Sequence, residues 1–401
     1  MQDDFNPLVE ETFESAHREY RRLRRECPVA YSSAWNGFWM LTRHADIERV
    51  LRDPSTFTTT VQNVVPRVAF TGRRPPLHLD PPEHTPYRRV LNRFFTKSKV
   101  EALAPRIREV AIELLEPLLA AGEGDFCRDF THPLPGLVFA HFFHLPRATA
   151  MRIREVTEGY DLALQQANDE LVKQASLRLY EIASEMIQER KARPMSPAED
   201  PTSALLAATD HGEKLPEDMV LGTLRQFIVV GMIAPIVFLG SCVVHLSEHP
   251  ELQQKLRDQP TLIPAAVHEY LRLFTPYRGF ARTARRDVQI QGRLIGVDEP
   301  IALNYASANR DEAVFPDGDR FILRRPNIGR HLAFGGGPHR CAGAPLAVVM
   351  FRIIFEELLG RTSSIELAGP IRMSGWPEIG TLSVPVHIKA GRQMRQRPEG
   401  G

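Results

Sequence analysis

The decapeptide FGGGPHRCAG occupies residues 334–343 and is the most specific pattern in the chain. Its three consecutive glycines, 335–337, let the backbone take positive φ and approach another group closely. Residues 344–361 have helix-forming composition, and Pro345 falls in the expected first turn, where proline is tolerated. Cys341 is therefore predicted at a helix N-terminus, where free N–H groups and the helix dipole lower the pKa of a thiol. Such a sulfur acts as a nucleophile or as a metal ligand.

The neighbours of Cys341 argue against two other kinds of loop. A cysteine-phosphatase loop has His directly before its cysteine and Arg downstream, whereas Arg340 and Ala347 stand at these positions. A phosphate-binding P-loop carries Gly-Lys-Ser/Thr before its helix, and this loop does not. A buried structural cysteine in a glycine-rich turn is a further alternative, although it does not explain why His339 and Arg340 adjoin the sulfur.

Taken together, the loop residues match a known signature. Six positions coincide with the haem-binding pattern FGxGxHxCxG: Phe334, Gly335, Gly337, His339, Cys341 and Gly343. The chain thus resembles the bacterial cytochrome P-450 superfamily of haem-thiolate monooxygenases. The resemblance implies the P-450 fold, mainly α with small β-sheets, and haem b (iron protoporphyrin IX) as the cofactor. It also implies that Cys341 ligates the iron, that Phe334 packs on the sulfur side and that His339 bonds a propionate.

A second motif lies upstream, where residues 268–272 read HEYLR. This resembles the zinc-protease motif HExxH until its last position, where Arg272 cannot ligate zinc. Glu269 and Arg272 instead match the family's ExxR pair, and their helical spacing puts both on one face. The resemblance implies a buried ion-pair network behind the haem, with Arg320 expected as its third member. A solvated surface pair of small energetic value is the alternative.

Further basic residues match positions that bind the haem propionates in this family. His84 and Arg88 fit the HxxxR motif of the propionate-binding helix, and their i, i+4 spacing places both on one helix face. Arg282, in RGFARTARRDV, matches the arginine that precedes the small sheet. The resemblance implies that Arg282 binds the other propionate.

A nearly uncharged stretch, residues 227–246, is long enough to span a membrane. It continues a helical pattern that runs from 216 to 248 and contains Gly231 and Pro235. A helix that is apolar on all sides is equally suited to be the buried axis of a large protein. The resemblance favours the buried axis, a helix that crosses the haem face opposite the cysteine.

This helix departs from the family pattern Ala/Gly-Gly-x-Asp/Glu-Thr, whose acid and alcohol relay protons. Residues 230–235 read VGMIAP, so Gly231 is retained while Ile233 replaces the acid and Ala234 the threonine. No catalytic acid–alcohol pair is therefore expected. Pro235 lacks an N–H and should kink or widen the helix, leaving a carbonyl that water can use. We expect protons to arrive through ordered water or a polar group of the substrate, with peroxide as oxidant the alternative.

The predicted pocket above the haem is largely apolar. It is expected to include the 61–70 segment as a lid, together with these side chains: Val230, Ile233, Ala234, Phe280 and Leu382. An apolar pocket suits a small hydrophobic substrate, and Phe280 can stack on an aromatic ring. The expected reaction is hydroxylation or oxidative dealkylation with O2. A haem protein that binds a ligand without turnover, and more remotely a cysteine hydrolase, are the alternatives.

Electrons are expected from a separate ferredoxin with its NAD(P)H reductase. The central helix and the run 275–288 show a weaker resemblance to haem domains of self-sufficient, reductase-fused members, but no reductase follows Cys341 in this sequence. Five basic residues are expected to form a surface for an acidic ferredoxin on the cysteine side: Arg88, Arg89, Arg93, Lys97 and Arg340. An ordinary solvated charge run is the alternative.

The composition argues against several kinds of binding partner and against secretion. The 50 basic and 49 acidic residues leave a formal charge of +1, which provides no field for nucleic acid or an anionic membrane. The four cysteines form no CxxC pair, and the N-terminus lacks a secretory pattern. We expect a cytoplasmic monomer with one haem domain over residues 1–401 and flexible ends at about 1–8 and 392–401.

The periodicity predicts a mostly helical chain. The expected helices are 10–27, 84–95, 99–121, 148–192, 216–248, 262–274 and 344–361. The expected strands are 288–290 with a partner directly after it, 300–304 and 383–388, and the proline-rich segments 73–84 and 192–201 are expected loops.

Overall fold

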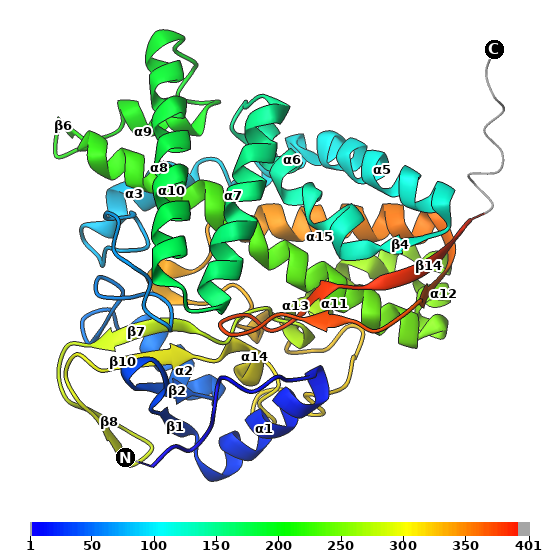
Figure 1. Ribbon diagram of the computed structural model, residues 1–401, viewed down its shortest axis with the longest axis horizontal. Coiled ribbons are helices and arrows are strands. Elements are labelled where there is room, and N and C mark those ends of the chain that lie inside the picture. The colour runs from blue at the N-terminus through cyan, green and yellow to red at the C-terminus, as the bar shows by residue number, and fades with distance from the viewer. Residues whose placement is uncertain (1, 392–401) are drawn as a thin grey trace.

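The computed structural model describes residues 2–391 and shows a helical body with several small sheets, which lie at separate places on it (Figure 1). This agrees with the predicted fold class. The helices are α1 Phe13–Glu26, α2 His44–Arg52, α3 His84–Asn92, α4 Lys97–Ala102, α5 Ala104–Ala121, α6 Pro133–Phe142, α7 Arg147–Gln165, α8 Asp169–Ala192, α9 Pro201–Ala207, α10 Glu217–Val230, α11 Ile233–Glu248, α12 Pro250–Asp258, α13 Ile263–Leu273, α14 Tyr305–Ala308 and α15 Ala344–Arg361.

The largest sheet has five strands in the order β1-β2-β10-β7-β3. Its strands are β1 Val29–Ser32, β2 Phe38–Leu41, β3 Phe57–Thr58, β7 Phe280–Ala284 and β10 Pro300–Leu303. Strand β10 runs parallel to β2 and antiparallel to β7, so the sheet joins the N-terminal segment to the region after α13.

The other strands form a three-stranded sheet, β11-β14-β4, and three two-stranded pairs. Their bounds are β4 Glu123–Asp125, β5 Thr209–Asp210, β6 Glu213–Lys214, β8 Val288–Ile290, β9 Arg293–Ile295, β11 Thr362–Leu367, β12 Arg372–Met373, β13 Thr381–Ser383 and β14 Pro385–Ala390. The predicted strand at 288–290 is confirmed, and β9 follows it as expected.

Several predicted helices are interrupted in the structure. The predicted 99–121 helix begins earlier and divides at Leu103, and the predicted 148–192 helix divides at residues 166–168. The predicted 216–248 helix divides at 231–232, whereas α15 has the expected bounds. Helices α2, α6, α9 and α12 and strands β1 and β2 were not predicted. Helix α6 begins PLPG, so its local composition indicates a turn, and burial of its apolar side chains stabilises it.

The central helices lie inside the protein. One stretch among residues 2–391, Glu217–Glu248, is long and apolar enough to cross a membrane, and 78% of its most apolar window is buried. A core helix meets the same criterion, and α11 packs against α7, the β13 strand and the β11 strand. The structure therefore agrees with the buried-axis interpretation of this segment.

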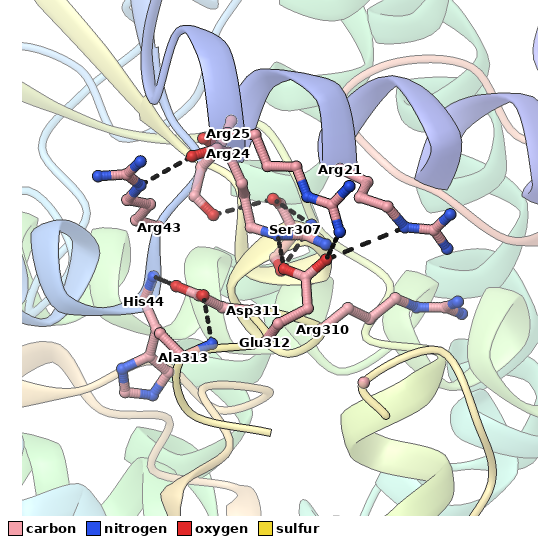
Figure 2. A network of polar contacts seen from close by, with 12 residues as sticks. Arg21, Arg24, Arg25, Arg43, His44, Ser307, Arg310, Asp311, Glu312 and Ala313 are labelled. Carbon is pink, nitrogen blue, oxygen red and sulfur yellow. Dashed lines mark hydrogen bonds and ion pairs between the residues drawn. The ribbon is translucent and has the colours of Figure 1, made fainter. Parts of the chain in front are cut away.

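A polar network fastens α1 and α2 to the segment after α14 (Figure 2). The Glu312 carboxylate pairs with Arg24 at 3.2 Å and Arg25 at 3.5 Å, both on α1. The Asp311 carboxylate accepts a bond from the His44 N–H at 2.8 Å, at the start of α2. These contacts hold the N-terminal elements beside the chain that leads to the cysteine loop.

The N-terminal segment contacts β1 rather than standing free. The Asp4 N–H donates to the Tyr31 carbonyl at 2.9 Å, and its carboxylate accepts from the Tyr31 N–H at 2.8 Å. The Ser33 N–H donates to the Asp3 carboxylate at 2.8 Å. These bonds attach Asp3 and Asp4 to β1 and the residue after it, and the flexible end expected at about 1–8 stays a prediction. Met1 and the other expected flexible end, 392–401, lie outside the described residues.

Candidate functional site

The cysteine loop is closed by backbone contacts of its own. The Cys341 N–H donates to the Phe334 carbonyl at 2.9 Å, directly before α15. Gly335 and Gly337 have φ of +64° and +61°, which favours glycine. A Cβ at Gly337 would lie 2.0 Å from the Leu51 carbonyl oxygen, so the loop also packs against α2. Glycine at 337 is therefore required by conformation and by space.

Burial governs the acidity of Cys341. It raises the pKa of the thiol, and bonds from the Gly343 and Ala344 N–H groups, with the charges of Arg88 and Arg340, lower the pKa by less. These bonds and charges are the effect that the sequence predicts for a helix start, and burial opposes it. A thiolate at this position therefore needs a directly bonded cation, which favours a metal ligand over a free nucleophile.

The Cys341 sulfur faces an internal cavity of about 370 Å³. The cavity lies between the cysteine loop and the α10–α11 segment. The predicted residues that line it are Arg88, Val230, Gly231, Ile233, Ala234, Pro235, Phe280, Arg282, Phe334, Gly335, His339, Cys341 and Gly343. From the expected lid, Val64 and Val68 also line it.

Leu382, also predicted for the pocket, is not among the residues that line this cavity. It lies in β13, where neighbouring side chains point to opposite faces. Thr381 faces α11, since a Cβ added at Gly240 would lie 2.2 Å from its hydroxyl oxygen. The Leu382 side chain is therefore directed away from the central helix.

The predicted propionate-binding residues gather at one side of the cavity. The rings of His84 and His339 lie 4.7 Å apart, and His339 faces Asp80 at 3.8 Å. Arg88 donates to the Asn92 side chain at 2.7 Å, and Arg282 donates to the Ala281 carbonyl at 2.8 Å.

This side of the cavity fits an anionic cofactor edge. Within residues 2–391 neither Arg88 nor Arg282 forms an ion pair, although Arg282 is only 5% exposed. His84 Nε2 is buried and has no hydrogen-bond partner among the described residues. Burial also lowers the pKa of His84 to about 4. Free cations and an unpaired ring nitrogen beside a cysteine suit a group that carries carboxylates around a metal ion.

Glu269 and Arg272 form the buried pair that the ExxR motif predicts, with bonds of 2.7 and 2.9 Å. The third member is Arg325, whose Nε lies 3.1 Å from Glu269, and not Arg320 as predicted. The exposed Arg320 contributes only its carbonyl oxygen, which accepts bonds from Arg272 and Arg325 at 3.0 Å. Both arginines lie in the same irregular segment, so the sequence does not show which of them turns inward.

Comparisons with known proteins agree with this geometry. A family model described as Cytochrome P450 matches residues 161–385. The mycinamicin IV hydroxylase/epoxidase of Micromonospora griseorubida is 34% identical over 87% of this chain and 88% of its own length. The linalool 8-monooxygenase of Pseudomonas putida is 30% identical over 92% of this chain and 96% of its own.

The chain is a cytochrome P450. Its fold is confirmed by the structure of P450 CYP109Q5 from Chondromyces apiculatus, which has a TM-score of 0.85 at 28% identity and covers 96% of this chain and 97% of that one. The protein is therefore a P450 monooxygenase with a haem iron cofactor. Cys341 and the free cations described above fit this cofactor.

The central helix of this P450 is divided as its sequence predicts. Helix α10 ends at Val230 and α11 begins at Ile233. Pro235 has no N–H to bond the Gly231 carbonyl four residues earlier, and its ring would clash with that carbonyl in a regular helix. A Cβ at Gly231 would lie 2.0 Å from the Phe139 ring, so this glycine also makes room for α6.

The sequence analysis did not identify several polar residues that line the P450 cavity, among them Arg74, Tyr160, Arg225 and Glu378. Arg225 interrupts an apolar helix, and this charge is the signal that could have identified it. Glu378 follows a buried tryptophan in an irregular segment and gave no such signal. Burial and the nearby Asp161 raise its pKa well above the ordinary value, which favours the neutral carboxyl group.

Proposed function

We propose that this P450 uses haem b to insert one oxygen atom from O2 into a small hydrophobic substrate, with an aromatic compound as one candidate. Hydroxylation and oxidative dealkylation are the expected reactions. The observation that carries the proposal is the apolar cavity above Cys341, in which aromatic side chains surround the central helix. Phe280 lies 4.3 Å from Tyr277 between ring centroids, and both line this cavity. Haem, when bound through Cys341, supplies the oxidising chemistry.

The chain's own residues orient the substrate and limit water. Ile233 and Ala234 present apolar side chains to the cavity, and Phe280 offers a ring face for stacking. No proton-relaying side chain stands at 233 or 234, so water at the Gly231 carbonyl is the proposed path for protons. Measuring the share of NAD(P)H electrons that reach product tests this path. Heavy loss of electrons to peroxide with a tightly bound substrate would refute it.

The proposed electron source is a ferredoxin with its NAD(P)H reductase. Arg89, Arg93, Lys97 and Arg340 are exposed, and none of them forms an ion pair in the described part of the chain. Unpaired exposed cations are available to an acidic partner, and their effect on association weakens with salt. The check is to measure the rate of turnover with ferredoxin and reductase at increasing salt concentration. The rate should fall as salt screens the association.

The function is tested by a compound screen on the haem-loaded protein. Loss of the iron-bound water, read as a low-to-high-spin shift, identifies binders, which are then tried with ferredoxin and reductase. The carbon monoxide spectrum of the reduced protein reports thiolate ligation, and Cys341→Ser should abolish that spectrum. Product with peroxide alone would support the peroxygenase alternative, which the absent acid–alcohol pair favours. Binders without product under either condition would support a non-catalytic ligand-binding protein.

A further inference from the structure

Two arginines that line the cavity are buried without an acidic partner. Arg225, on α10, is 0% exposed, and Arg74, in the proline-rich segment before α3, is 4% exposed. The segment packs on α8 and α10: Thr71 bonds Ser176 at 2.6 Å, and a Cβ at Gly222 would touch the Arg73 carbonyl. Helices α8 and α10 run side by side (Figure 1). The arginines therefore meet where three elements close one end of the cavity.

The contacts of Arg225 are all with neutral groups. Its guanidinium donates to the Ser176 hydroxyl at 2.8 Å and to the Gln226 side-chain oxygen at 3.3 Å. It also lies 5.1 Å from the Tyr160 ring centroid and 5.9 Å from that of Tyr180. These contacts orient the guanidinium but leave its charge uncompensated.

Arg74 has fewer contacts still. Its side chain makes no hydrogen bond within residues 2–391, and the Nε atoms of Arg74 and Arg225 are both buried without a partner there. Neither arginine forms an ion pair in that range. A buried charge costs several kcal/mol unless an opposite charge and hydrogen bonds compensate it, so the pair suits an anion that enters from the cavity.

The haem propionates do not account for these two cations. Arg88 and Arg282 lie beside His84 and His339. Burial is the largest cause of the lowered pKa of His339, and the charges of Arg282 and Arg88 lower this pKa further. Arg74 acts on Arg225 instead: burial and then the charge of Arg74 lower the pKa of Arg225 to about 10. The cavity therefore has two separate pairs of cations.

Nearby titratable groups do not neutralise the second pair. Burial, helped by the charges of Arg74 and Arg225, lowers the pKa of His78 to about 3, so this ring is neutral. Glu378 also lines the cavity, and burial raises its pKa well above the ordinary value, which favours its neutral form. The end of the cavity formed by α8 and α10 is thus positively charged in an apolar enclosure.

We propose that Arg225 and Arg74 bind a carboxylate of the substrate, so that the substrate is an organic acid with an apolar, oxidisable body. This inference rests on the proposed function and narrows its substrate class. Guanidinium groups bind carboxylates through charge-assisted, often bidentate hydrogen bonds. The carboxylate fixes one end of the molecule, and the apolar body extends along the aromatic lining of the cavity.

Matched pairs of an acid and its neutral amide test the charge directly. The haem-loaded protein is titrated with para-ethylbenzoate and para-ethylbenzamide, and with octanoate and octanamide, by spin-state shift and by isothermal titration calorimetry. At least one acid is expected to bind roughly tenfold to a hundredfold more tightly than its amide, because only the acid forms charge-assisted hydrogen bonds to the guanidinium groups. Equal or weaker binding of both acids overturns the proposal.

Variants test whether Arg225 and Arg74 cause the tighter binding of the acid. Arg225→Gln and Arg74→Gln should each remove most of the preference for the acid, and Arg73→Gln, an exposed neighbour, should retain it. The Arg74 side chain forms no hydrogen bond within residues 2–391, so Arg74→Gln is expected to fold. This variant therefore tests the proposal even if Arg225→Gln does not fold. Retained acid preference in Arg74→Gln and in any folded Arg225→Gln protein overturns the proposal. Turnover of a neutral compound without acid preference would leave the proposed function intact, whereas tight acid binding without turnover would refute only the function.

Discussion

Replacing Arg325 by alanine should destabilise the protein far more than replacing Arg320. The Arg325 side chain is 3% exposed and faces a Glu269 carboxylate that is 1% exposed. Its Nε lies 3.1 and 3.3 Å from the two Glu269 oxygens, and its other nitrogens donate to main-chain carbonyls including that of Arg320. Alanine would leave part of a buried charge and several carbonyl groups without partners.

Removing one member of a buried ion pair costs about 3–5 kcal/mol, and Arg272 retains part of the compensation for Glu269. We therefore expect Arg325→Ala to lower the free energy of unfolding by about 3 kcal/mol and to lower haem content. Urea unfolding followed by circular dichroism gives the first quantity. The Soret absorbance per protein gives the second.

Arg320→Ala is the matched control, because that side chain is exposed and the network uses only its carbonyl oxygen. We expect Arg320→Ala to change the free energy of unfolding by no more than about 0.5 kcal/mol, as other surface substitutions do. Arg325→Lys, which keeps the charge and loses the forked geometry, should fall between the two. An equal cost for Arg320→Ala and Arg325→Ala would refute the assignment of Arg325 as the third member.

Three other predictions concern the cysteine loop, a buried acid and the basic surface. Gly337→Ala, with φ of +61° and a main-chain oxygen 2.0 Å from the new Cβ, should lower haem content strongly, whereas Gly336→Ala, whose nearest contact is 3.4 Å, should not. Burial raises the pKa of Asp161 from 3.8 to about 7, so its neutral form is favoured in the folded protein and stability should fall as pH rises between these values. In Asp161→Asn, unfolding measured across this range should show a smaller slope, because Glu378, whose pKa burial also raises, keeps its own contribution. Arg93→Glu should raise KM for ferredoxin at low salt and leave carbon monoxide binding unchanged, and an equal effect of Lys173→Glu, on α8, would contradict a specific docking surface.

The sequence predicted features that depend on local backbone chemistry. The cysteine loop follows from its glycines and the helix start, and the break before Ile233 follows from the missing N–H of Pro235. It did not predict which arginine joins Glu269, because that choice depends on how an irregular segment folds back. Helix α6 was also missed, since its two early prolines obscure a segment that burial stabilises.

Positions 233 and 234 of the central helix carry no polar side chain. The polar groups that line this cavity come from other positions. Arg225 is on α10, Arg74 on the proline-rich segment and Glu378 on the segment before β13. Because Pro235 has no N–H to bond the Gly231 carbonyl, the break leaves this carbonyl as an acceptor for water, close in sequence to the replaced acid and threonine. Substrate binding by charge and proton supply by water are then separate tasks of separate elements. A carboxylate held by the arginines would leave Ile233 and Ala234 to pack against its apolar body, which explains why apolar side chains suit these two positions.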